Sequence, residues 1–223
     1  MIACRQRLTG LLACLTAAPL VAQRPPFPSD GHLTAQAPDS FLVRFETTKG
    51  NVILHAHRTW SPLGVDRLYQ LVRAGYYNGT VIYRVGPTAS FKGGFVVQFG
   101  IGNSGDLNRA WDRAPLADEP VRHGNARGTV NFARAGPNTR TVELAINLTA
   151  NTTMDTVSYG GVRGFPPIAE VIDGMDVLEA LNRQYGNRVF DQWDSVMASG
   201  RRYLDRVYPG LDRIIRASIV NVR

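Results

Sequence analysis

The stretch from Thr80 to Gly102 constrains the fold more than any other part of this 223-residue chain. It reads as two strands, Thr80–Val85 and Phe95–Phe99, joined by a loop rich in glycine and proline. Because side chains alternate between the two faces of a strand, Ile82 and Arg84 are expected to share one face. The second strand adds an amide and more apolar groups. The pair therefore places a guanidinium and an amide beside apolar side chains.

The rest of the chain shows further short strands and two separated helices, which predicts a mainly β fold: an antiparallel barrel capped at its ends. A stretch rich in turns is expected between Gly102 and Gly128, and residues 191–207 have roughly helical spacing interrupted by Gly200. These residues predict a helix inserted before the closing strand. The other expected strands are 41–46, 52–57, 129–133, 144–148, 166–171 and 218–222, and the expected capping helices are 61–75 and 175–185.

The N-terminus is typical of an exported protein. Residues 1–22 combine a basic start with a short apolar run and a plausible cleavage site, which predicts a signal peptide. A location in the periplasm or outside the cell follows, while an uncleaved anchor or a lipoprotein is the weaker interpretation. Residues 23–39 read as a disordered linker, and residues 40–223 as one domain with a helical insertion at about 187–215.

Composition excludes several classes of function. Both cysteines, Cys4 and Cys14, lie in the expected signal peptide, which excludes thiol catalysis, disulfides and cysteine-bound metals in the mature chain. Removing residues 1–22 leaves a net charge of 23 − 18 = +5, with the arginines scattered. No basic patch indicates nucleic-acid binding. The apolar run is too short for a stable membrane span.

Two motifs identify a family. Tyr83-Arg84-Val85 followed by Phe95-Val96-Val97-Gln98 resembles the cyclophilin segment that carries the catalytic arginine, and residues 128–139 (GTVNFARAGPNT) resemble the second cyclophilin signature. The resemblance extends from about Phe41 to Gly186. It implies a closed antiparallel barrel of eight strands with two capping helices, to which this chain adds an extra C-terminal helix. It also implies a monomeric peptidyl-prolyl cis-trans isomerase that acts on proline-containing polypeptides without a cofactor or metal.

The resemblance also implies roles for individual residues. Arg84 corresponds to the catalytic arginine, and Gln98 to the amide that orients it and the substrate carbonyl. The remaining substrate-binding positions of the family fall on Phe95, Val96, Ala133, Arg134, Glu143, Ala145, Met154 and Phe165.

Three departures from the family pattern leave a second function open. Glu143 stands where the family has glutamine, and its carboxylate would compete for Arg84 as an ion-pair partner. Ala145 stands where a phenylalanine floors the proline pocket, and the loop from Gly86 to Gly94 is longer than usual. Thr153 also stands where the family has a tryptophan. The first hypothesis is an isomerase that assists the folding of exported proteins. The alternative is a binding module or chaperone for proline-containing peptides, with weak or no catalysis.

Two further patterns have plain interpretations. Gly100-Ile-Gly-Asn-Ser-Gly105 matches the dinucleotide-binding fingerprint, but no helix or βαβ repeat is expected around it, so it is interpreted as a loop. His55 and His57 share a strand face and would supply half a metal site. No third ligand is indicated, so they are interpreted as surface histidines.

Overall fold

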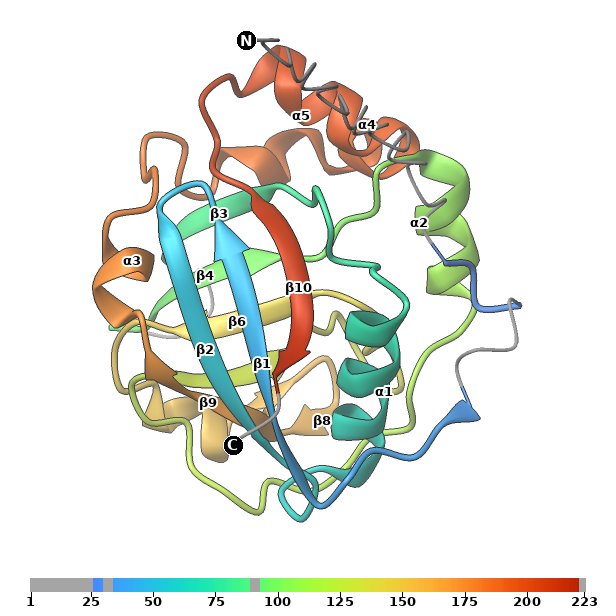
Figure 1. Ribbon diagram of the computed structural model, residues 1–223, viewed down its shortest axis with the longest axis vertical. Coiled ribbons are helices and arrows are strands. Elements are labelled where there is room, and N and C mark those ends of the chain that lie inside the picture. The colour runs from blue at the N-terminus through green and yellow to red at the C-terminus, as the bar shows by residue number, and fades with distance from the viewer. Residues whose placement is uncertain (1–25, 30–33, 89–92, 221–223) are drawn as a thin grey trace, which may run out of the picture.

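In the computed structural model of the chain, the described residues are 26–29, 34–88 and 93–220 (Figure 1). The expected signal peptide, residues 1–22, lies outside this part. The described residues of the expected linker make hydrogen bonds with the rest of the domain. Trp111 Nε1 donates to the carbonyl of Pro26 at 3.0 Å, and the Ala37 amide donates to Asp66 at 2.9 Å. These residues lie against the domain, because apolar Phe27 packs on its core.

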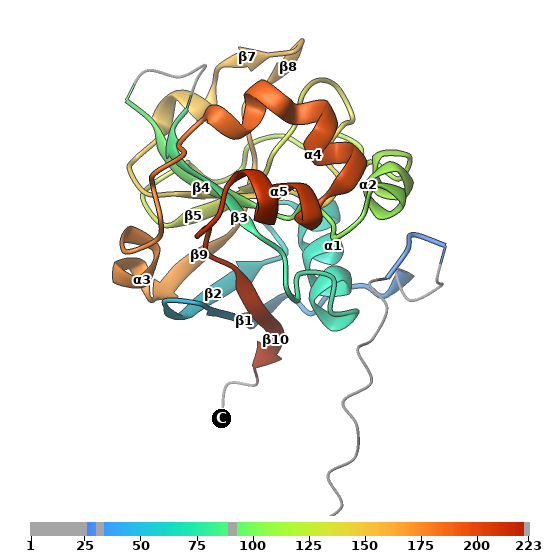
Figure 2. The same ribbon diagram turned by 90° about the horizontal axis from the view of Figure 1, so that it is seen from above.

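Eight strands form one strongly curled antiparallel sheet. Its spatial order is β10-β1-β2-β9-β5-β6-β4-β3, and the views in Figures 1 and 2 show the sheet wrapping around a central core. A separate two-stranded sheet pairs β7 (Ser158–Tyr159) with β8 (Val162–Arg163). The strands of the large sheet are β1 (Ser40–Thr47), β2 (Gly50–His57), β3 (Ile82–Pro87), β4 (Phe95–Phe99), β5 (Thr129–Phe132), β6 (Leu144–Asn147), β9 (Pro167–Asp173) and β10 (Ile214–Val220).

The expected eight-stranded antiparallel architecture is confirmed, although full closure overstates it. The edge strands β3 and β10 meet only at one end, through an isolated bridge between Val81 and Arg213. Backbone hydrogen bonds from Gly79 to Ile214 (2.7 Å) and from Ile82 to Asp212 (2.8 Å) reinforce this junction. The seam therefore depends on the few residues that precede each edge strand.

Helices flank the sheet as Figure 1 shows. Helix α1 (Pro62–Arg73) begins with proline at its first turn and buries one apolar stripe, including Val65 and Leu68. The short helix α3 (Met175–Glu179) contacts β2. The expected insertion contains a 3-10 helix, η3 (Arg188–Gln192), and then α4 (Trp193–Ser199) and α5 (Arg201–Val207), which Gly200 separates. A further 3-10 helix, η2 (Thr152–Asp155), follows β6.

The core has two parts. The main cluster fills the inside of the curled sheet and includes Phe45, Phe99 and Phe132, which are almost completely buried. The smaller cluster lies between the insertion and β3, and its members are Val81, Tyr83, Ile101, Val189, Val196, Leu204, Tyr208 and Leu211. Figure 2 shows α4 and α5 over this side of the sheet. The insertion therefore has its own apolar contacts with the strand that carries Arg84.

A β-bulge in β3 interrupts the alternation of side chains that the sequence predicted. Ile82 pairs with Phe99 and Arg84 pairs with Gln98, so Tyr83 is an extra residue between them. Ile82 accordingly faces the main core, whereas Arg84 faces outward with the adjacent Tyr83 in the second cluster. The prediction that Ile82 and Arg84 share a face is wrong for this reason.

One helix was missed in the stretch expected to consist of turns. Helix α2 (Gly105–Asp112) follows Ser104, whose side chain accepts a hydrogen bond from the Leu107 amide as an N-cap. A helix therefore does follow the glycine-rich residues 100–105. The neighbouring strands are antiparallel, however, and no βαβ unit surrounds them. None of the helices in the described ranges combines the length and apolar character that crossing a bilayer requires.

Candidate active site

Four side chains form a row across the outer face of the sheet. Arg84 on β3 pairs with Gln98 on β4, Gln98 pairs with Ala145 on β6, and Ala145 pairs with Asn131 on β5. Paired residues of antiparallel strands share a face. Their sequence neighbours Val97, Leu144 and Ile146 lie in the main core on the other face. The curled sheet thus brings four of its strands together under one line of side chains.

Arg84 is held by a hydrogen bond from each guanidinium nitrogen. Nε donates to Asn187 Oδ1 at 2.8 Å, Nη1 to Gln98 Oε1 at 2.9 Å and Nη2 to the Pro87 carbonyl at 2.6 Å. Arg84 is only 8% exposed, and burial lowers the pKa of its guanidinium from the ordinary value. Arginine nevertheless stays charged in proteins. The bonds to described residues use three of its five N–H groups, which leaves two for other acceptors.

The insertion supplies two of the contacts around this guanidinium. Asn187 accepts the Nε bond, and the ring centroid of Phe190 lies 5.0 Å from the Arg84 Cζ atom, a cation–π distance. Phe190 also contacts Tyr83 edge-on at 6.2 Å and Trp193 at 5.3 Å between ring centroids. Neither residue was expected in the site, because the sequence predicted the insertion only as an added helix.

Glu143 reaches Arg84 only through another side chain. Gln98 Nε2 donates to Glu143 Oε2 at 3.2 Å, and the Tyr83 hydroxyl donates to the same carboxylate oxygen. Burial raises the pKa of Glu143, while these two hydrogen bonds act in the opposite direction. Among the described residues the pair Arg84–Glu143 forms no salt bridge; the contacts run from Arg84 through Gln98 to Glu143 and end at Tyr83. The expected competition for Arg84 is therefore not seen.

The expected apolar positions form a mostly buried group. Val96, Ala145, Met154 and Phe165 are each less than a tenth exposed. Phe95 is half-buried, packs against the main core and has the Arg183 Cζ atom 5.4 Å from its ring centroid. It lies at the first position of β4, where alternation points it away from the face of Gln98. The structure thus places Val96 with Gln98, and Phe95 apart from them.

Arg134 holds a loop. Its guanidinium donates to the carbonyls of Tyr159 (2.5 Å), Val162 (2.9 Å) and Gly164 (2.6 Å), and its Cζ atom lies 4.2 Å from the Phe165 ring centroid. The neighbouring Ala133 amide donates to the Glu143 carbonyl at 2.9 Å. The side chain of Arg134 therefore fixes the β7–β8 hairpin and the position of Phe165.

The sequence indicated no third ligand for His55 and His57, but the structure brings a candidate close to them. Glu170 on β9 lies beside them, and candidate ligand atoms of the three residues all fall within 4.8 Å of one another. Sequence analysis missed Glu170 because it is 113 residues beyond His57.

The sequence of the chain matches those of known proteins. The family model of cyclophilin-type peptidyl-prolyl cis-trans isomerases matches residues 42–198. The chain is 28% identical over 187 residues to peptidyl-prolyl cis-trans isomerase B of Escherichia coli, covering 81% of this chain and 99% of that protein. It is 31% identical over 179 residues to peptidyl-prolyl cis-trans isomerase A of Dickeya dadantii, covering 78% and 83%.

Solved structures share the fold at lower identity. A cyclophilin-type peptidyl-prolyl cis-trans isomerase of Cryptosporidium parvum superposes with a TM-score of 0.55 and 16% identity, covering 82% of this chain and 99% of that one. The same protein solved in the presence of the dipeptide Ala-Pro gives a TM-score of 0.54 over 81% and 99% of the two chains, at the same identity.

Proposed function

Because this chain belongs to the cyclophilin-type peptidyl-prolyl cis-trans isomerase family, we propose that its isomerase activity centres on Arg84 and serves polypeptides exported from the cytoplasm. The observation that carries the first part is the fixed guanidinium of Arg84, which three hydrogen bonds hold and the Phe190 ring contacts. The observation that supports the second part is the signal-like pattern of residues 1–22.

Catalysis of prolyl peptide-bond rotation requires mainly one well-placed hydrogen-bond donor. Rotation about a peptide bond meets a barrier of about 18–20 kcal/mol because the twisted geometry loses amide resonance. In the twisted state the prolyl nitrogen becomes a hydrogen-bond acceptor, which it is not in the planar state. A donor at this position therefore binds the transition state better than the substrate. Arg84 keeps two N–H groups for this role after its contacts with Asn187, Gln98 and Pro87.

Gln98 and three apolar side chains would orient the substrate. Gln98 uses its Oε1 atom to hold Arg84 and donates from Nε2 to Glu143, so its position is fixed from both ends. Val96, Met154 and Phe165, whose side chains are buried, are the proposed contacts of the proline ring. Proline-containing peptides are the substrate class, in line with the Ala-Pro dipeptide present with the Cryptosporidium relative.

Substitution of Arg84 tests the proposal. We expect Arg84→Ala to lower kcat/KM for a Xaa-Pro tetrapeptide in a protease-coupled assay by about 100-fold or more, the usual cost of removing one transition-state donor. Arg84→Lys keeps the charge but loses the planar fork, and should recover only part of the rate. Circular dichroism must show both variants folded. An Arg84→Ala enzyme with the wild-type rate would contradict the assignment.

A specific observation favours the second function, a binding module with weak catalysis. Ala145 leaves the floor of the expected pocket without an aromatic ring, and Phe190 covers one side of Arg84. If the wild-type chain turned over at the spontaneous rate but still bound a proline peptide in a fluorescence titration, this alternative would hold. Arg84→Ala would then weaken binding without changing any rate.

Export is tested separately. We expect the full-length chain, expressed in a Gram-negative host, to appear in the periplasmic or extracellular fraction and to lose residues 1–22, as mass spectrometry of the N-terminus would show. Replacing Leu11 and Leu12 by arginine interrupts the apolar run and should retain the chain in the cytoplasm. Cytoplasmic accumulation of the unaltered chain would contradict the exported role and leave the isomerase activity untouched.

A further inference from the structure

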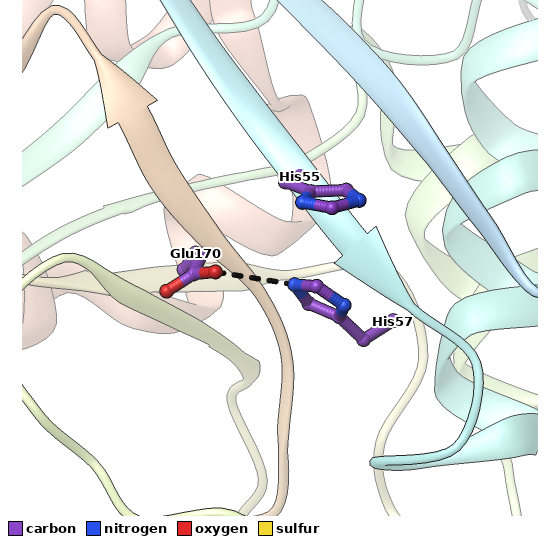
Figure 3. A group of neighbouring side chains, drawn as sticks. All are labelled: His55, His57 and Glu170. Carbon is purple, nitrogen blue, oxygen red and sulfur yellow. Dashed lines mark hydrogen bonds and ion pairs between the residues drawn. The ribbon is translucent and has the colours of Figure 1, made fainter.

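Three potential metal ligands converge on the outer face of the sheet, away from the row that contains Arg84. His55 and His57 are two residues apart on β2, so they share a face, and Glu170 on β9 pairs directly with His55 (Figure 3). The residues between and beside them, Leu54 and Ala56, are fully buried in the main core. Strand pairing therefore places two imidazoles and one carboxylate together on the outer surface.

The distances suit a small metal ion. His57 Nε2 lies 3.2 Å from Glu170 Oε1, and the ligand atoms of all three residues lie within 4.8 Å of one another. Ligand bonds of 2.0–2.2 Å in a tetrahedral site separate ligand atoms by about 3.3 Å. The pair His57–Glu170 already has this separation. His55 lies close by, with its ring centroid 4.1 Å from that of His57.

The position of His57 is fixed by aromatic stacking. Trp60 stacks on its ring at 4.2 Å with 24° between the planes, and His123 stacks on the other side of Trp60 at 3.6 Å and 4°.

From this geometry we propose that His55, His57 and Glu170 form a binding site for a divalent transition-metal ion of the zinc, nickel and copper group. Two imidazoles and one carboxylate match the ligands that these ions prefer, and they leave a fourth position open to solvent. Magnesium and calcium prefer sites made of oxygen ligands. The ion would join β2 to β9, two strands distant in sequence, and so stabilise the folded chain by mass action.

Binding to the untagged full-length protein tests the proposal. We expect isothermal titration with Zn²⁺, Ni²⁺ and Cu²⁺ to show one ion per chain, and thermal unfolding to shift upward as the metal concentration rises. Titration with Mg²⁺ or Ca²⁺ under the same conditions should show no binding. Absence of binding for all three transition metals, or equal binding of Mg²⁺, would overturn the proposal.

Substitutions identify the ligands. His55→Ala, His57→Ala and Glu170→Gln should each weaken Zn²⁺ binding by about tenfold or more, because each removes one coordinate bond. His123→Ala is the matched control: it removes a nearby histidine that is separated from His57 by Trp60, and it should leave the affinity within about twofold of wild type. Unfolding curves without metal establish that the variants fold, and Glu170→Gln keeps the side-chain shape. Unchanged affinity in Glu170→Gln, or a loss confined to His123→Ala, would refute the three-ligand site.

Discussion

Glu143 places a carboxylate beside the row that contains Arg84, where the family has a glutamine. Its carboxylate accepts from Tyr83 and from Gln98, and through Gln98 it helps to hold Arg84. A glutamine at this position would accept the same two bonds with its carbonyl oxygen. Glutamate and glutamine at this position therefore differ in charge. The consequence is that the free energy of unfolding depends on pH when the residue is glutamate.

We expect Glu143→Gln to stabilise the protein at neutral pH. Burial raises the pKa of Glu143 above its unfolded value, so between these two values the folded state binds more protons than the unfolded state. The free energy of unfolding of the wild type therefore falls as pH rises through this window, and the loss is complete above the folded pKa. Glu143→Gln removes this loss, so its free energy of unfolding should stay level where that of the wild type falls.

Urea unfolding at several pH values between 4 and 8 measures the difference. The control is Glu179→Gln, because Glu179 is about half exposed and pairs with Arg127 on the surface. Its unfolding free energy should follow the wild type within a few tenths of a kcal/mol at each pH. A Glu143→Gln variant whose stability also fell with pH to the same extent as the wild type would assign the effect to another group.

At the scale of elements, the insertion completes the site. The segment that enters η3 brings Asn187 and Phe190 to Arg84, while α4 and α5 anchor it through the second apolar cluster. Ala145 lies on the opposite side of Gln98 from Arg84, without an aromatic ring. We therefore expect Phe190, which is still 36% exposed, to serve as the aromatic wall that the floor of the pocket lacks.

Substitution of Phe190 tests this role. Phe190→Ala removes the cation–π contact with Arg84 and the apolar wall, and it should lower kcat/KM by about fivefold, the equivalent of about 1 kcal/mol. Phe190→Leu keeps apolar bulk and should lose less. The exposed Ile215→Ala is the control and should leave kcat/KM unchanged. Faster turnover in Phe190→Ala would show instead that the ring obstructs the substrate.

Strands and helices were predictable where the sequence pattern that indicates them lies within a few neighbouring residues. The strands around Phe41–Glu46 and the helix after Pro62 follow from alternation, from 3.6-residue spacing and from proline at a first turn. The bulge at Tyr83 was not predictable, because it depends on how β3 meets β4. Helix α2 was missed because it has only eight residues and its glycine-rich start resembles a loop.

At the scale of the whole molecule, the family motifs indicated the fold, but contacts between distant segments required coordinates. Arg84 and Gln98 were paired correctly because only one loop separates their strands. Asn187 and Glu170 reach their partners through strand order and the insertion, and no periodicity in the sequence encodes which strands become neighbours. The same holds for the seam where the two edge strands meet.

Asp212 joins three distant segments at this seam. It is buried, and its carboxylate accepts from the Thr48 hydroxyl at 2.6 Å and from the Asn182 amide at 2.7 Å, while its carbonyl accepts from Ile82 at 2.8 Å. The first two bonds tie the β1–β2 turn and the segment after α3 to the start of β10. Only a few backbone bonds otherwise join β3 to β10.

We expect Asp212→Ala to lower the free energy of unfolding by about 3 kcal/mol, because it removes a charged acceptor from two partly buried donors. Asp212→Asn retains one acceptor oxygen and should cost less. The control, Asp205→Ala, breaks two exposed ion pairs with Arg201 and Arg213 and should cost at most about 1 kcal/mol. Urea unfolding of the three variants at one pH measures these losses in the free energy of unfolding. If Asp212→Ala cost no more than the control, the backbone bonds alone would hold the seam, and the buried carboxylate would have no share in closing the sheet.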